Sequence, residues 1–313
     1  MARPDGPVIF ILNPRSAAGA TLRRFERYRP RFTERLPDME VWLTERPGHA
    51  TELSRRAVRE GAGAVIAVGG DGTNNEVVNG FFDEDGERLV ADTAFGVVTS
   101  GTGGDFRRTF GWPIDPLEDL ARIERGEVRR IDVGRVRYTA LDGSERLRHF
   151  VNIGSLGISG RIVDTVNRSS KTLGAKASFM AGTVRNIVGY RPQGVRIFCD
   201  DEPCRDQDVT VVAVSNGQYF GGGMWVAPDA VVDDGLFTAV IIEGGGLSLW
   251  LQHGLKIYTG RHKSMREVQI RAVKRLRAEP RGSDEVLIEL DGEQSGRLPA
   301  TFEILPGALP LLA

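Results

Sequence analysis

The feature that most constrains the fold is a short apolar run that leads directly into a glycine-rich turn. Ala64–Val68 is entirely apolar, Gly69-Gly70-Asp71-Gly72-Thr73 follows it, and a stretch typical of a helix comes next. A continuous apolar run of this length indicates a strand that is buried on both faces. A buried strand, a glycine turn and a helix form the unit from which parallel, doubly wound sheets are built.

The same order of strand, loop and helix recurs in the first part of the chain. Val8–Leu12 predicts another buried strand, followed by Asn13-Pro14 and by an Arg-rich helix over 21–35 that we expect Pro30 to interrupt. In doubly wound sheets, ligands bind where loops leave the carboxyl ends of the strands. We therefore expect loops 13–19, 69–73 and 100–105 to meet at one crevice.

The second part of the chain has a different pattern. From Val128 onward, short alternating runs such as 148–153 and 209–215 predict antiparallel strands. A chain of 313 residues is also long for a single core. We expect an α/β domain over 1–130 and a β-rich domain over 131–300, with residues 301–313 either ending the second domain or returning to the first.

Composition excludes several classes of protein. The 41 Lys+Arg and 42 Asp+Glu give a formal net charge of −1, so no global field attracts nucleic acid. The two cysteines, Cys199 and Cys204, cannot complete a four-ligand zinc site and are expected to be free thiols in a reducing cytoplasm. No apolar run approaches the roughly 20 residues that cross a bilayer. We expect a cytoplasmic protein without a transmembrane segment, whose membrane contact is peripheral.

The aspartate inside the first glycine turn requires an explanation. Glycine N–H groups and a helix N-terminus favour bound phosphate, whereas the Asp71 carboxylate repels it. A divalent cation between the two groups removes the conflict, as does proton transfer from an attacking hydroxyl to the carboxylate. Phosphoryl transfer therefore gives Asp71 a role. The alternative is a tight turn in which Asp71 or Thr73 caps the helix.

A second turn carries two carboxylates. Asp291-Gly292-Glu293 follows the apolar-rich stretch Val286–Leu290. A carboxylate held in this way can activate a hydroxyl nucleophile. From these residues alone a solvated hairpin turn is favoured, because Asp-Gly is a strong turn dipeptide.

Taken together, the motifs resemble the diacylglycerol kinase catalytic-domain family, which includes sphingosine and ceramide kinases and bacterial soluble lipid kinases. The matching elements stand in the family's order: Asn13-Pro14-Arg15-Ser16 with Gly19, Thr44 with Gly48-His49-Ala50, Gly69–Val77, Gly101-Thr102 with Asp105-Phe106, Ile131-Asp132-Val133-Gly134, Asn216-Gly217 with Gly221-Gly222-Gly223, Pro228 with Asp234-Gly235, and Asp291-Gly292-Glu293. The resemblance implies a doubly wound nucleotide-binding domain, similar to those of NAD kinase and phosphofructokinase, followed by a β-sandwich-like domain.

The resemblance also implies an ATP-dependent lipid kinase that uses Mg²⁺ and moves the γ-phosphoryl group to a lipid hydroxyl. Asp71 and Glu293 would be catalytic, with Glu293 as the proton acceptor. Asp234 and the Leu236 carbonyl would hold a structural Mg²⁺, although Val231 replaces a further polar ligand. The implied nucleotide contacts are Asn13, Pro14, Arg15, Ser16, Ala17, Thr44, Gly69, Gly70, Asp71, Gly72, Thr73 and Thr102.

Several alternatives stay open at this point. Diacylglycerol is the leading acceptor, and a sphingoid base or ceramide is the next. The glycine turn is shared with NAD kinases, so NAD is a further candidate substrate. Ala17 and Gly104 depart from the family pattern, which leaves room for a non-catalytic nucleotide- or lipid-binding regulator. The lipid would be met at a membrane surface, for which the basic, amphipathic segment 171–185 is one candidate, and a homo-oligomer stays open.

Overall fold

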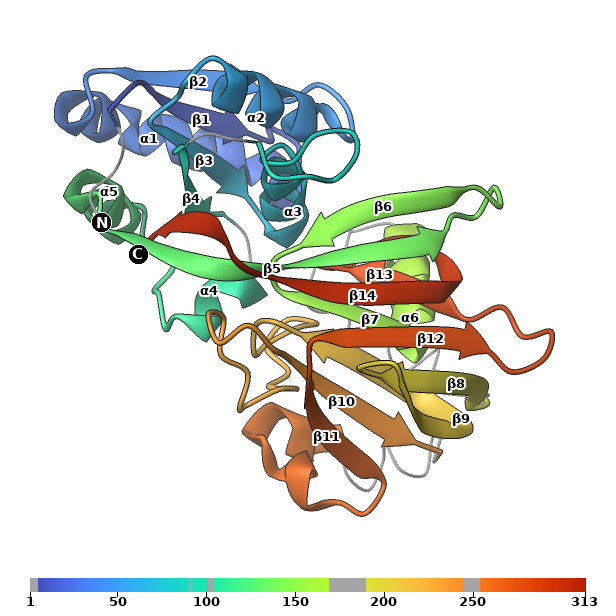
Figure 1. Ribbon diagram of the computed structural model, residues 1–313. Coiled ribbons are helices and arrows are strands. Elements are labelled where there is room, and N and C mark those ends of the chain that lie inside the picture. Colours follow the sequence, from blue (N-terminus) through green and yellow to red (C-terminus); the bar gives the residue numbers. More distant parts are fainter. Residues whose placement is uncertain (1–4, 90–91, 101–103, 169–189, 245–253) are drawn as a thin grey trace. The chain divides into compact units, whose positions relative to one another are not determined.

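The computed structural model describes residues 5–313 apart from 90–91, 101–103, 169–189 and 245–253 (Figure 1). The chain divides into two compact units. Unit 1 comprises Met1–Asp132 together with Gly307–Ala313, and unit 2 comprises Val133–Pro306. The final segment thus belongs to the same unit as the N-terminal strands. Asp132 fixes this return, because its Oδ1 accepts the N–H of Gly307 at 2.7 Å.

Unit 1 is built on a parallel sheet. Its strands are β1 (Val8–Leu12), β2 (Met39–Leu43), β3 (Ala64–Gly69) and β4 (Ala94–Thr99), in the spatial order β2-β1-β3-β4. β1, β3 and β4 are buried along their whole length, as strands covered on both faces must be. The end of β14 (Glu293–Leu312) joins this sheet, since Leu311 pairs with Phe95 in parallel.

Helices follow the strands of unit 1. They are η1 (Ser16–Gly19), α1 (Ala20–Arg35), α2 (His49–Arg59), α3 (Asp71–Asn79), α4 (Asp105–Thr109) and α5 (Pro116–Arg125). The expected interruption at Pro30 is wrong, because α1 continues through it. Pro30 is exposed, while Phe25 and Phe32 on either side of it are buried and pack on Phe10 with ring centroids 5.7 and 5.4 Å away. Packing of the two flanking turns outweighs the loss of one solvent-facing hydrogen bond.

Unit 2 consists mainly of antiparallel strands. Its elements are β5 (Val128–Thr139, which begins in unit 1), β6 (Glu145–Phe150), β7 (Ile153–Gly157), α6 (Ile158–Arg168), β8 (Gln193–Cys199), β9 (Glu202–Ser215), β10 (Phe237–Glu243), η3 (Gly254–Thr259), η4 (Arg261–Ser264), β11 (Val268–Val273), β12 (Arg275–Pro280), β13 (Leu287–Leu290) and most of β14. The pairings form a closed circuit, β9-β7-β13-β14-β12-β8 and back to β9. Closure leaves these six strands without a free edge and encloses the core.

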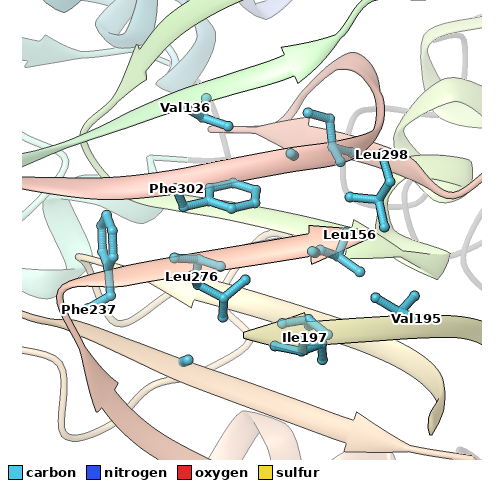
Figure 2. Packing of buried hydrophobic residues seen from close by; sticks show 14 of the residues in the cluster. Val136, Leu156, Val195, Ile197, Phe237, Leu276, Leu298 and Phe302 are labelled. Atoms are coloured by element: carbon cyan, nitrogen blue, oxygen red, sulfur yellow. The ribbon is translucent and has the colours of Figure 1, made fainter. Parts of the chain in front are cut away.

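The core of unit 2 lies inside this circuit. Figure 2 shows Leu156, Ile197, Leu276 and Phe302, from four different strands, converging on one apolar cluster. All four side chains are fully buried. In the part of the chain that the structure describes, no helix combines the length and the apolarity needed to cross a membrane.

Candidate active site

The glycine turn after β3 brings the first loop of unit 1 against the start of α3. α3 begins at Asp71, directly after Gly70. A Cβ atom at Gly69 would lie 2.4 Å from Thr73 Oγ1, so glycine is required for Thr73 to fold back over the turn. Thr73 Oγ1 in turn accepts a hydrogen bond from Asn13 Nδ2 at 3.4 Å. Two of the loops predicted to bind phosphate are therefore in contact.

Asp71 connects the same turn to the third loop. Its Oδ2 accepts the N–H groups of Gly104 and Asp105, both at 3.0 Å, and its Oδ1 accepts the N–H of Phe106 at 3.3 Å. Burial raises the pKa of Asp71, while the three N–H donors and Arg107 favour the ionised form. The carboxylate thus holds the third loop to the start of α3.

The first loop is organised by its own polar groups. Asn13 Oδ1 accepts the N–H of Arg15 at 3.0 Å, and Ser16 Oγ donates to the Asn13 carbonyl at 2.8 Å. Ser16 Oγ also lies 2.6 Å from Thr21 Oγ1, which donates to Ser100 Oγ at 2.9 Å. The hydroxyl chain links the first loop to the residue that follows β4.

The two departures from the family pattern each have a conformational consequence. Ala17 and Ala18 have positive φ angles of 49° and 52°, a region in which a side chain costs roughly 1–2 kcal/mol. The loop therefore takes a conformation suited to glycine even though alanine stands there. Gly104 has φ +68°, and a Cβ atom on it would lie 2.8 Å from Thr99 Cγ2. The close approach to Thr99 and the positive φ explain glycine at this position.

The remaining predicted nucleotide contacts surround these loops. Thr44 follows β2 directly, its side chain is buried, and its N–H donates to the Leu12 carbonyl at 2.9 Å. Pro14 is half-buried and Arg15 is exposed. Thr102 lies outside the described residues.

Glu76 is a residue of α3 for which the sequence predicted no role. Its carboxylate accepts the N–H groups of Gly48 and Ala50, at 3.0 and 3.1 Å, where α2 begins. A carboxylate at a helix N-terminus satisfies N–H groups that have no partner within the helix. The family motifs Gly48-His49-Ala50 and Asn75-Glu76-Val77 are thus parts of one contact.

In unit 2, Asp291 binds three consecutive N–H groups in the same way as Asp71. Its Oδ2 accepts from Val151 at 2.9 Å, and its Oδ1 accepts from Asn152 and Ile153, both at 3.0 Å. Asp291 is buried and has a positive φ of 47°, so the turn is strained as well as anchored. The residue is a structural anchor between β13 and the start of β7.

Asn152 and Asn216 extend this anchor. The N–H groups of Asn216 and Gly217 donate to the Asn152 carbonyl at 2.9 and 2.8 Å, and Asn216 Nδ2 donates to the Val151 carbonyl at 2.8 Å. Asn152 Nδ2 donates to the Tyr219 carbonyl at 2.8 Å. The family's Asn-Gly motif therefore lies beside the second carboxylate turn.

Glu293 and Glu289 have different surroundings. Glu289 is buried and accepts hydrogen bonds from Ser155 Oγ at 2.7 Å and from the N–H of Gly292 at 2.8 Å. Glu293 is partly exposed, and its Oε2 forms an ion pair with Arg148 Nη2 at 2.7 Å. Of the two carboxylates, Glu293 is therefore the one that solvent reaches. Arg148, which the sequence did not single out, fixes its orientation.

The predicted metal ligands form a local turn. The N–H of Leu236 donates to Asp234 Oδ1 at 3.0 Å, and Gly235 between them has φ +74°. Within the described ranges, no group of three or more His, Cys, Asp or Glu side chains is placed to hold a metal ion. One carboxylate oxygen and one carbonyl fit Mg²⁺ only when water supplies its other ligands.

Comparison with protein families assigns both units. Residues 7–136 match the diacylglycerol kinase catalytic domain, and residues 152–313 match the YegS C-terminal NAD kinase beta sandwich-like domain. The chain belongs to the diacylglycerol kinase family. The predicted membership and fold class are thereby confirmed, and the family identifies the chain as a lipid kinase that uses ATP.

The names of individual relatives are consistent with this family membership. A Chromohalobacter salexigens protein named "probable lipid kinase YegS-like" is 32% identical over 76% of this chain and 72% of its own length. The diacylglycerol kinase of Bacillus subtilis is 27% identical over 93% of this chain and 91% of its own.

Solved structures share the fold. A crystal structure of a diacylglycerol kinase from Bacillus anthracis has a TM-score of 0.70 at 22% identity, covering 98% of this chain and 96% of its own. Yeast NADH kinase has a TM-score of 0.51 at 12% identity, covering 99% of this chain and 83% of its own. The second likeness agrees with the expected NAD kinase-like architecture.

Proposed function

We propose that this lipid kinase transfers the γ-phosphoryl group of ATP to the free hydroxyl of a diacylglycerol, with Mg²⁺ as cofactor. The observation that carries the proposal is the Asp71 contact. It holds loop 104–106 against a glycine turn and a helix N-terminus, an arrangement suited to polyphosphate. Diacylglycerol is taken from the names of relatives that match most of the chain.

The nucleotide would be bound by the three loops of unit 1. In this proposal the backbone N–H groups of Gly69–Thr73 and the polar groups of Asn13, Ser16 and Thr44 contact the nucleotide. The chain has no Gly-x-x-x-x-Gly-Lys-Ser/Thr segment, so no lysine of that motif binds phosphate. Oriented N–H and hydroxyl donors, together with the α3 N-terminus, would provide the positive potential instead.

Glu293 would be the general base. The acceptor hydroxyl oxygen attacks the γ-phosphorus, the new O–P bond forms, and the bond to the β,γ-bridging oxygen breaks to release ADP. The hydroxyl proton passes to the Glu293 carboxylate. Arg148 supports this role, because the ion pair at 2.7 Å keeps one oxygen fixed while the side chain stays partly exposed.

Mg²⁺ would neutralise charge on the transferred phosphoryl group. The Asp71 carboxylate is the candidate to orient the nucleotide's metal ion, in addition to its contacts with the third loop. Asp234 and the Leu236 carbonyl would hold a second, structural ion with water as the remaining ligands.

A sphingoid base or ceramide is the alternative acceptor, because none of the motifs distinguishes one lipid hydroxyl from another. NAD is less favoured, since residues 7–136 match the diacylglycerol kinase catalytic domain and a relative that is 32% identical is named a lipid kinase. A non-catalytic regulator is also less favoured, because Ala17 and Gly104 leave the contacts of Asp71 and Asn13 in place.

The decisive experiment is an assay with radiolabelled ATP against separate samples of a mixed lipid extract and NAD, followed by identification of the labelled product. Label in phosphatidic acid is the expected result. Label in a sphingoid phosphate, in ceramide phosphate or in NADP would identify the corresponding alternative. No label in any fraction, from protein that binds ATP, would support the regulator.

A further inference from the structure

A solvent-facing apolar pair stands out on unit 2. It lies on η3, a 3₁₀ helix, in which side chains at positions i and i+3 share a face. Leu255 and Tyr258 have this spacing and are 83% and 44% exposed. Ile257, on the opposite side, packs against the apolar cluster that includes Val226 and Ala227. The helix thus has one apolar side chain, Ile257, partly buried against the core and two apolar side chains exposed to solvent.

The segment that carries this pair is fixed to the core. The N–H of Trp225 donates to the Ile257 carbonyl at 3.0 Å. His262, on η4, is buried, and its Nε2 lies 2.8 Å from the Val226 carbonyl. Gly260 connects η3 and η4 with φ +69°, and a Cβ atom there would lie 3.0 Å from Pro228 Cγ. Leu255 and Tyr258 are therefore presented by an anchored turn.

Basic residues are close to the exposed pair in the sequence. Residues 254–266 contain Lys256, Arg261, Lys263 and Arg266 and no Asp or Glu, with Glu267 next in the chain, although the whole chain has a net charge of −1. Arg261 and Arg266 are exposed, and Lys263 forms an ion pair with Asp229. The concentration of positive charge predicts an acidic partner.

A continuous series of contacts links this segment to the turn of Glu293. The Trp225 ring stacks on Tyr219, with centroids 5.8 Å apart and planes within 5°. The Tyr219 carbonyl accepts Asn152 Nδ2 at 2.8 Å, and the N–H of Asn152 donates to Asp291 at 3.0 Å. A partner bound at η3 would thus lie on the framework that positions the proposed base.

We propose that residues 254–266, here called the 254–266 surface, bind an anionic lipid bilayer. The proposal rests on the lipid kinase function and adds where the enzyme meets its substrate. Leu255 and Tyr258 would enter the headgroup region, while the surrounding Lys and Arg side chains bind lipid phosphates. A whole aromatic side chain buries about 150–250 Å², and Tyr258 is only 44% exposed, so the pair adds well under about 400 Å², whereas a stable protein partner needs about 800 Å² per side. The small apolar area and the local positive charge therefore favour a membrane.

The test is sedimentation with vesicles of phosphatidylcholine, with and without phosphatidylglycerol. We expect the unchanged protein to bind the anionic vesicles and to bind the neutral ones at least tenfold more weakly. Leu255→Ser with Arg261→Gln should weaken anionic binding by about fiftyfold, from roughly tenfold for the leucine and fivefold for the charge. The matched control is Leu141→Ser with Arg146→Gln, an exposed apolar and basic pair elsewhere in unit 2, which should bind as the unchanged protein does.

Three results would overturn the proposal: equal binding of neutral and anionic vesicles, full binding by the Leu255/Arg261 variant, or a dimer in light scattering that this variant abolishes. A kinase assay with a short-chain, dispersed diacylglycerol separates the two proposals. If the Leu255/Arg261 variant turns over the dispersed substrate normally but no longer turns over diacylglycerol in vesicles, the result supports membrane binding by the 254–266 surface. No turnover by the unchanged protein on any acceptor, with vesicle binding intact, contradicts the substrate assignment and leaves the surface supported.

Discussion

The two carboxylate turns of this enzyme use the same anchor for different purposes. Asp71 in unit 1 and Asp291 in unit 2 each accept three consecutive backbone N–H groups from a distant segment. In the first turn, the anchoring carboxylate is also the candidate chemical group. In the second turn, Asp291 is buried and the candidate base is a separate residue, Glu293.

This difference teaches what each turn tolerates. A substitution of Asp71 alters loop structure and chemistry together, so its effects cannot be separated by activity alone. In the second turn the two functions stand two residues apart and can be removed one at a time. A variant of Asp71 should therefore lose both activity and stability. In the second turn, a variant of Glu293 should lose mainly activity, and a variant of Asp291 should lose mainly stability.

The largest expected effect is that of Glu293→Gln. Glutamine keeps the size of the side chain but cannot take the hydroxyl proton, so kcat should fall by roughly a hundred- to ten-thousandfold while ATP affinity is spared. Saturating lipid in mixed micelles and a separate ATP-binding titration measure the two quantities. Glu285→Gln, which neutralises another Arg-paired carboxylate of unit 2, is the control. A loss of ATP binding would instead make Glu293 a nucleotide ligand and Asp71 the better candidate base.

Asp71→Asn should have the next largest effect. It removes the charge and turns one acceptor into a donor facing N–H groups, so kcat should fall by at least about a hundredfold. Stability should fall too, by about 1–3 kcal/mol in denaturant unfolding. Asp83→Asn removes the charge of a carboxylate whose Oδ1 accepts two N–H groups at another turn of unit 1, and it should change neither quantity by much. Near-normal turnover in Asp71→Asn would exclude the proposed role.

The sequence predicts the local parts of these turns better than their partners. The apolar run 64–68 followed by glycine indicates β3, the turn and α3, because burial and backbone sterics are local properties. The expectation that loops 13–19, 69–73 and 100–105 meet follows from sheet topology, and contacts such as Asn13 with Thr73 join them. The helix break at Pro30 fails because the packing of Phe25 and Phe32 is not visible in local propensity.

Partners far apart in the chain could not be predicted. Arg148 and Glu293 are 145 positions apart and come together through the pairing of strands, which the sequence alone does not specify. Glu76 on α3 caps the start of α2 from 26 to 28 positions away, and no local sequence pattern connects a carboxylate in one helix with the N-terminus of another. The motifs of the site can be recognised in the sequence, but the contacts that their residues make with distant parts of the chain cannot be predicted from it.

Asp291→Asn tests the second anchor by itself. The variant leaves Glu293 in place but removes a buried charge that accepts three N–H groups, so unfolding free energy should fall by about 2–3 kcal/mol. Asp142→Asn, at an exposed turn in the same unit, should cost less than about 0.5 kcal/mol. Equal losses in both variants would contradict the anchoring role of Asp291.

Arg148→Gln should have a smaller effect, of about tenfold in kcat, because it frees the Glu293 carboxylate without removing it. The double variant with Glu293→Gln should be no slower than Glu293→Gln alone, since the two residues act through one contact. Arg146→Gln, two positions earlier on the same strand, should leave kcat unchanged. Additive losses in the double variant would show that Arg148 acts on the phosphates or elsewhere.

Asp234→Ala should have the smallest effect. The variant extends the comparison of the Asp71 and Asp291 turns to a third turn, and it tests whether Asp234 binds an ion in addition to stabilising its own turn. If Mg²⁺ binds there, the unchanged protein gains about 1.4 kcal/mol of stability at ten times the Kd, and the variant gains none. Asp142→Ala is the matched control, because Asp142 accepts the N–H two residues on, as Asp234 does. It loses the same turn contact but keeps the Mg²⁺ response. If Mg²⁺ shifts Tm equally in the unchanged protein and in both variants, Asp234 does not bind the ion and only stabilises its turn. Mg²⁺ would then bind only together with the nucleotide.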